Sequence, residues 1–138
     1  MNLAASLRQL GKRVVLFDAD FGMANAHIML GTNPTTTVGD FLKGEIGMAD
    51  TLTETPTGLK FIAGGSGLTE LLNLDNKARY NMLSGISSLE DEIDYLIVDS
   101  PAGASNSALF FVTAVNIPLI VLVAEPTSFL DAYALVKA

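Results

Sequence analysis

The sequence contains no cysteine and no tryptophan, and it has a single histidine, His27. Without cysteine, these 138 residues cannot form a disulfide, a thiolate zinc site or a cysteine-ligated iron–sulfur cluster. One histidine is too few for a histidine-rich metal site, or for a catalytic dyad together with the groups that orient it. Several classes of metalloprotein and of nucleophilic enzyme are therefore excluded for these residues.

Positive charge is scarce as well. Lys and Arg number 8 against 15 Asp and Glu, which gives a formal net charge of −7. A nucleic-acid-binding surface needs the opposite balance, so we expect no direct contact with nucleic acid. Hydrophobic residues make up 49% of the chain, a share too high for a disordered protein.

Long uninterrupted apolar runs are also missing. The most apolar stretch, Leu109–Ala124, is broken by Asn116 and Pro118 and is shorter than the roughly 20 residues of a membrane-spanning helix. The N-terminus has no basic region ahead of an apolar core, so it is not typical of a signal peptide. The sequence predicts one acidic globular domain, residues 1–138, in the cytoplasm.

Apolar, β-branched runs alternate with segments of helical spacing. This alternation is typical of an α/β fold with a mostly parallel sheet. The last predicted strand is the most apolar of the four. The predicted strands are Val14–Phe17, Leu59–Ala63, Tyr95–Val98 and Ile117–Val123. Helices are expected over residues 3–10, 21–30, 38–42, 68–72, 77–92, 107–114 and from 128 onward, with a brief segment at 49–52.

Carboxylates follow three of these strands. Asp18 and Asp20 end the first, Asp99 follows the third, and Glu125 follows the fourth. Because ligands of open α/β sheets bind at the carboxyl ends of the strands, we expect four carboxylates at one edge, with magnesium as their partner. Taken alone, Asp18 and Asp20 are equally typical of helix N-caps, and Asp99 of a turn.

Three segments in order resemble the MinD/ParA-type P-loop ATPases. Val14–Asn25 resembles their switch I segment, Tyr95–Gly103 their Walker B strand and switch II, and Ala124–Tyr133 the segment after the next strand. Within that family, further stretches are most similar to the FlhG/FleN (YlxH) branch, which regulates flagellar number and placement. Those stretches are Gly31–Pro34, Gly58–Gly67 and Thr127–Lys137.

The resemblance implies a three-layer α/β/α fold and a magnesium-dependent ATPase that dimerises with ATP between its subunits. It also implies flagellar or polar-positioning proteins as partners. Asp20 matches the catalytic aspartate that positions the attacking water, Asp18 its neighbour near the magnesium shell, and Asp99 the Walker B aspartate that holds magnesium. Gly103 matches the switch II glycine whose N–H approaches the γ-phosphate, and Asn25, Glu125 and Asp131 match positions near the dimer face or the signature lysine.

The chain departs from the family in one respect. No G-x-x-x-x-G-K-[ST] phosphate loop occurs in it, and Gly64–Gly67 is not followed by lysine. The match resembles the middle of a MinD-type domain, truncated at both ends. We therefore expect weak or absent binding of ATP and Mg²⁺ by this chain, and membrane contact only through segments outside it. In the family a central strand lies beside Ile117–Val123, so we expect a gap there, direct closure, or completion by another chain.

Three other functions remain open at this point. The chain is also consistent with a nucleotide-free interaction or scaffold module that kept the fold and lost the phosphate loop. Another ParA-type partitioning or positioning ATPase is a second alternative. A bacterial tyrosine kinase, which shares the Walker B region, is a third.

Overall fold

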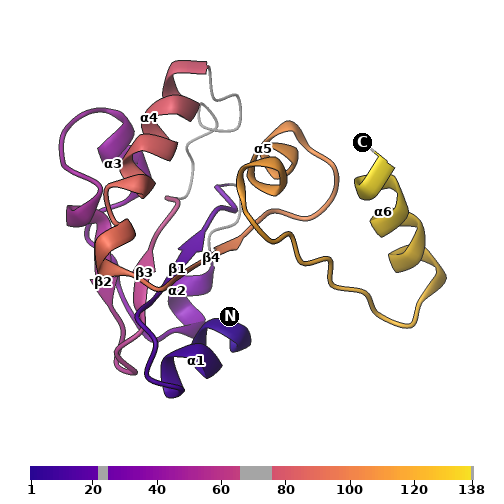
Figure 1. Ribbon diagram of the computed structural model, residues 1–138, viewed down its shortest axis with the longest axis horizontal. Coiled ribbons are helices and arrows are strands. Elements are labelled where there is room, and N and C mark those ends of the chain that lie inside the picture. Colours follow the sequence, from indigo (N-terminus) through magenta and orange to yellow (C-terminus); the bar gives the residue numbers. More distant parts are fainter. Residues whose placement is uncertain (22–24, 66–75, 138) are drawn as a thin grey trace. The chain divides into compact units, whose positions relative to one another are not determined.

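The computed structural model describes residues 1–21, 25–65 and 76–137 (Figure 1). The chain divides into two compact units, Met1–Asp99 and Ser100–Ala138. The first unit contains the whole sheet, and the second contains two helices joined by an extended segment. None of the helices in the described ranges is long and apolar enough to cross a membrane.

The described sheet has four strands in the order β2-β3-β1-β4. β1 (Val14–Asp18) lies at its centre and pairs in parallel with β3 (Lys60–Ile62) and with β4 (Tyr95–Asp99). β2 (Leu52–Glu54) pairs antiparallel with β3 at the other edge. The predicted α/β fold with a mostly parallel sheet is thus confirmed, while β2 is a short strand that the sequence pattern did not predict.

The described residues of the first unit form four α-helices: α1 (Asn2–Gln9), α2 (Ala26–Met29), α3 (Val38–Leu42) and α4 (Asn76–Ser87). Single 3₁₀ turns lie at Ala49–Thr51 and Glu90–Glu92. In Figure 1, α3 and α4 lie beside each other, away from α1. The start of α3 is fixed by a capping box, in which Thr37 and Asp40 satisfy each other's backbone and side-chain groups.

The centre of the sheet is also the centre of the core. All five residues of β1 are buried. Val14 and Leu16 point to one face of the sheet, where they pack in a cluster with Ala4 of α1 and Phe61 of β3. Full burial of a side chain such as Leu16 stabilises the fold by about 1.5–3 kcal/mol. Because β1 is buried on both faces, its C-terminal end is held in place, and so is the start of the segment that follows it.

Some predicted boundaries and burials need correction. The helix predicted over 77–92 ends at Ser87 and is followed by a 3₁₀ turn. Of the apolar residues in this range, Met82 and Leu89 are buried, whereas Leu83 is 39% exposed. Within the predicted 21–30 helix the structure describes only α2, and the predicted 68–72 helix lies outside the described residues.

β4 is also less buried than a strand in the middle of a parallel sheet. Its first and last residues are exposed, and the three between are half-buried. The reason is its position, because β4 is the last strand of the described sheet and pairs only with β1. The strand predicted from its apolar run at 95–98 is thus confirmed, but the run is only half-buried and not buried on both faces as β1 is.

The second unit contains α5 (Asn106–Ala114) and α6 (Pro126–Lys137). Ser105 caps α5, since its side-chain oxygen accepts a hydrogen bond from the Ala108 N–H at 3.2 Å. The strand predicted at 117–123 is wrong, because the segment is extended but belongs to no described strand, and Val121 is 87% exposed.

Candidate functional site

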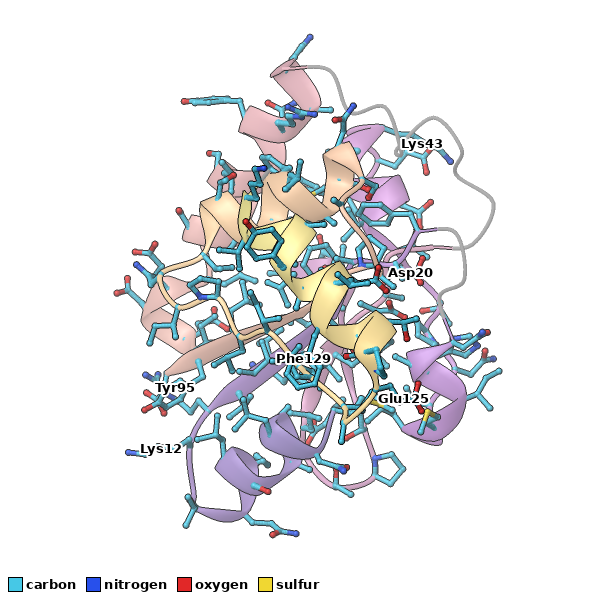
Figure 2. The ribbon with its side chains drawn as sticks, turned by 90° about the vertical axis from the view of Figure 1, so that its right-hand side faces the viewer. Lys12, Asp20, Lys43, Tyr95, Glu125 and Phe129 are labelled. Carbon is cyan, nitrogen blue, oxygen red and sulfur yellow. The ribbon has the colours of Figure 1, made fainter. Side chains whose placement is uncertain are left out.

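The site begins where β1 and β4 end together. Asp18 and Asp99 are partners in the parallel register, so their side chains leave the same face of the sheet. The Ala19 N–H donates to the Asp99 carbonyl oxygen at 2.9 Å, which extends the pairing one residue further. The expectation that these aspartates lie at one edge is confirmed. Figure 2 shows Asp20 at this end of the sheet and Tyr95, at the start of β4, at the other.

Asp18 is a charged side chain buried in the core, with only 4% of its surface exposed. Its Oδ1 accepts the Asp20 N–H at 3.2 Å, and its Oδ2 accepts the Ala26 N–H at 3.3 Å. Burial raises the pKa of Asp18 above its ordinary value, and the two N–H donors counteract part of that rise. The charges of Asp99 and Asp20 raise this pKa further.

The other two carboxylates are more accessible. Asp20 is half-buried, two residues beyond the end of β1, and Asp99 is exposed at the end of β4. Asp99 is the register partner of Asp18 and Asp20 follows Asp18 by two residues, so the three carboxylates belong to one edge of the sheet. A cluster of like charges of this kind is stabilised by a cation or by a ligand that brings one.

Gly64, which follows β3, packs against the backbone at the end of β1. It is buried, and a Cβ at this position would overlap the backbone oxygen of Asp18 and stand 2.8 Å from the Phe21 ring. The Phe21 ring packs in turn against Phe17, with ring centroids 6.3 Å apart. Only glycine fits here, and the backbone after β1 is therefore held by neighbours on several sides.

The remaining predicted site residues are not brought to this edge by the sheet. Asn25 is exposed just before α2, and its side chain makes no capping hydrogen bond. Gly103, Glu125 and Asp131 belong to the second unit. Gly103 has a φ of 83° and open space where a Cβ would stand, and Asp131 is exposed on α6. Because 117–123 is not a strand, the prediction that a sheet strand presents Glu125 at this edge is wrong.

The aspartate edge suits a magnesium–nucleotide complex better than a metal held by protein alone. Over residues 1–21, 25–65 and 76–137 there is no group of three or more His, Asp or Glu arranged to hold a metal ion. Magnesium, however, is commonly bound by one or two carboxylates together with phosphate oxygens and water. Asp99, exposed beside Asp18, fits that use, so the residues present are compatible with the ion.

A groove of about 280 Å³ lies at the opposite end of the strands. Its lining mixes cations and anions, and Lys60 already pairs with Glu92 at 3.7 Å. We place the candidate site at the aspartate edge instead, because the carboxyl ends of parallel strands bind ligands in open α/β sheets. The groove is lined by Arg8, Arg13, Val14, Glu54, Gly58, Lys60, Glu92 and Ile93.

One interaction near this groove was missed by the sequence reasoning. Arg13 and Asp94 each stand just before a strand, and they pair with an Nη2–Oδ1 distance of 2.8 Å, while the Arg13 N–H donates to Asp94 Oδ2. The pair ties the start of β4 to the start of β1. The sequence signal for such a contact is a basic residue directly before one strand and an acidic residue directly before the strand that pairs with it in parallel.

The mostly parallel sheet, in which aspartates end two adjacent strands, defines an α/β protein. No family profile matches the chain. Antiactivator FleN of Pseudomonas aeruginosa is 38% identical over 137 residues, which is 99% of this chain and 49% of FleN. The flagellum site-determining protein YlxH of Helicobacter pylori is 32% identical over 99% of this chain and 46% of YlxH.

Solved structures agree with these relatives. The cell division ATPase MinD of Pyrococcus furiosus superposes with a TM-score of 0.80 at 28% identity, covering 95% of this chain and 55% of that one. MinD of Pyrococcus horikoshii, complexed with Mg-ADP, has a TM-score of 0.80 at 24% identity, over 94% of this chain and 53% of its own, and supports the fold alone.

The chain belongs to the MinD/ParA-type family of P-loop ATPases, and within it is similar to the FleN and YlxH branch. It spans about half the length of the curated relatives that it matches.

Proposed function

We propose that this chain is part of a MinD-like ATPase that controls the number or placement of flagella. The observation that carries the proposal is the aspartate edge, where Asp18 and Asp99 are in register and Asp20 follows two residues later. The similarity to FleN and YlxH over nearly the whole chain supports the flagellar role in preference to other ParA-type positioning.

In this proposal Asp20 is the catalytic residue and orients the attacking water toward the γ-phosphate. Asp99 holds magnesium through water, and Asp18 is the register partner of Asp99 on β1. Magnesium, when bound with the nucleotide, neutralises charge on the phosphates. The Gly103 N–H is the donor that approaches the γ-phosphate, which is the role that the family resemblance implies for it. Asn25, Glu125 and Asp131 lie near the face at which two ATP-bound subunits meet or near the signature lysine.

The 138 residues alone bind Mg-ATP weakly or not at all in this proposal. The aspartate edge brings three negative charges, and the chain has no phosphate-loop lysine to offset them or the phosphates. Like charges about 4 Å apart repel by about 4 kcal/mol at an effective dielectric of 20. Since about 1.4 kcal/mol changes affinity tenfold, this cost removes micromolar binding. Calorimetry with Mg-ATP on the chain tests it, and a Kd near 1 µM would contradict it.

The ATPase proposal itself is tested in a chimera. The matched half of P. aeruginosa FleN is replaced by this chain, so that FleN supplies the other half of its own length. We expect the chimera to hydrolyse ATP, and to restore the parental flagellar count in a P. aeruginosa strain that lacks FleN. Phosphate release and electron microscopy of flagella are the two measurements.

Two variants of the chimera assign the chemistry. Asp20→Ala should abolish hydrolysis while ATP binding remains, because Asp20 acts on the water and not on the nucleotide. Asp91→Ala, a change of the same size at an exposed aspartate far along the chain, should leave both unchanged. A chimera that binds no ATP, or an Asp20→Ala chimera that hydrolyses it normally, refutes the proposal.

A scaffold module that binds no nucleotide is the second candidate. It is favoured by the exposed apolar side chains of the 117–123 segment, among them Ile117 at 76% and Leu119 at 69%, which offer a surface to a partner. A chimera that restores the flagellar count in both the parent and the Asp20→Ala forms, without hydrolysis in either, would support this candidate over the ATPase.

A further inference from the structure

The two oxygens of Asp18 are both directed at the backbone of the chain that follows it. Oδ1 accepts the N–H of Asp20, and Oδ2 accepts the N–H of Ala26, at 3.2 and 3.3 Å. With 4% exposure, the carboxylate is nearly closed off from solvent. A charged group buried this deeply is tolerated only where it is hydrogen-bonded.

These two bonds join the end of β1 to two separate points of the next segment. The bond to Asp20 closes a turn of the kind that aspartate forms with the residue two positions on. The bond to Ala26 satisfies one of the unpaired N–H groups at the start of α2, where Asn25 makes no side-chain cap. Asp18 therefore caps α2 from eight residues away.

The rest of the turn is held by packing. Ala19 is tied to β4 through its N–H bond to the Asp99 carbonyl, and Gly64 lies against the Asp18 backbone and the Phe21 ring. Asp20 thus stands between residues that are fixed on both sides. The backbone that carries its carboxylate has little freedom, and Asp18 supplies the polar part of that restraint.

We propose that Asp18 is a positioning residue, whose carboxylate holds the turn carrying Asp20 and the start of α2, and that magnesium does not use it as a ligand. The inference deepens the proposed function. It rests on that function only for the catalytic role of Asp20. It replaces the role near the magnesium shell that the family resemblance implies for Asp18. An oxygen pair engaged by two N–H groups and closed to solvent leaves Asp99 as the carboxylate open to the ion.

Amide hydrogen exchange on the full chain, followed by NMR, tests the positioning. In Asp18→Ala the Asp20 and Ala26 amides should exchange at least about tenfold faster, because hydrogen bonds to a charged acceptor are lost. In Asp18→Asn one acceptor oxygen remains, so only one of the two amides should accelerate. Leu89→Ala, a buried change elsewhere in the same unit, should speed neither amide selectively.

If both amides exchange in Asp18→Ala at the same rate as in the parent, the proposal is overturned. If Asp18→Ala does not fold, parental exchange rates for both amides in Asp18→Asn would overturn it. A titration with MgCl₂ alone adds a second readout. We expect any magnesium-dependent shifts to survive in Asp18→Asn and to disappear in Asp99→Asn. Loss in Asp18→Asn would overturn the proposal by making Asp18 the ligand. A silent chimera would refute the ATPase and leave these results intact.

Discussion

Two apolar runs of this chain, β1 and residues 117–123, differ in what surrounds them. β1 lies between β3 and β4, and all of its residues are buried. The 117–123 segment is at least as apolar, yet it joins no described strand, and its side chains are exposed. An apolar, β-branched run therefore indicates that a segment is able to form a strand, whereas neighbours that pair its backbone decide whether it does.

The same difference separates the carboxylates of the candidate site. Asp18 and Asp99 follow strands that are paired in register, and they come together at one edge. Glu125 follows the unpaired segment, and its backbone carbonyl instead accepts the N–H of Ser128 at the start of α6. Paired strands thus place side chains in a way that sequence order alone does not.

The largest effect is expected from a matched pair of leucines. Leu16 in β1 is 0% exposed and Leu119 is 69% exposed. Leu16→Ala should lower the free energy of unfolding by about 2–5 kcal/mol through lost burial and a cavity. Leu119→Ala should change it by less than about 0.5 kcal/mol. Urea unfolding followed by circular dichroism measures both.

A milder pair serves if Leu16→Ala does not fold. Ile62→Val, at a buried position of β3, should cost about 0.5–1.5 kcal/mol. Ile117→Val, at an exposed position, should cost nearly nothing. Equal costs in either pair would mean that the 117–123 segment is buried in solution.

The next effect concerns two glycines, Gly64 after β3 and Gly103 after β4. Gly64→Ala should lower the free energy of unfolding by about 1–3 kcal/mol, since its Cβ overlaps the Asp18 backbone and the Phe21 ring. Gly103→Ala should cost about 1–2 kcal/mol from its φ of 83° alone, because the space around it is open. Unfolding curves give the costs, and NMR shifts at Asp20 should move only for Gly64→Ala. Shifts at Asp20 in both variants would contradict this account.

The smallest effect tests the Arg13–Asp94 pair, which ties β4 to β1. Hydrogen bonds from Arg13 lower the pKa of Asp94 below its ordinary 3.8. A group whose pKa is lower in the folded state than in the unfolded state stabilises the fold at pH values above its unfolded pKa. That stabilisation is lost as the pH falls through the folded pKa. Asp94→Asn should therefore be less stable than the parent at pH 6, and this difference in stability should shrink as the pH falls below 3.8 and through the lower folded pKa of Asp94. A gap that does not change with pH would contradict this account.

Much of the fold could be predicted from the sequence because three of the predicted runs also find strands to pair with. β1 and β3 each pair with two strands, and β4 pairs with β1. The aspartate edge followed too, since parallel strands end on one side. Three features did not follow. The exposure of β4 and of residues 117–123 depends on which strands lie beside them, and the Arg13–Asp94 pair depends on register. The two N–H bonds of Asp18 depend on the path of the following turn, which no periodicity encodes.

The central claim is that the first unit builds the aspartate edge on a paired sheet while residues 117–123 remain unpaired. Amide hydrogen exchange of the whole chain tests this most directly, because it reports pairing residue by residue. We expect the amides of Val15, Leu16 and Phe17 to be strongly protected, and those of Leu119 to Leu122 to exchange within about tenfold of unpaired peptide rates. Protection of Leu119 to Leu122 equal to that of β1 would contradict the account.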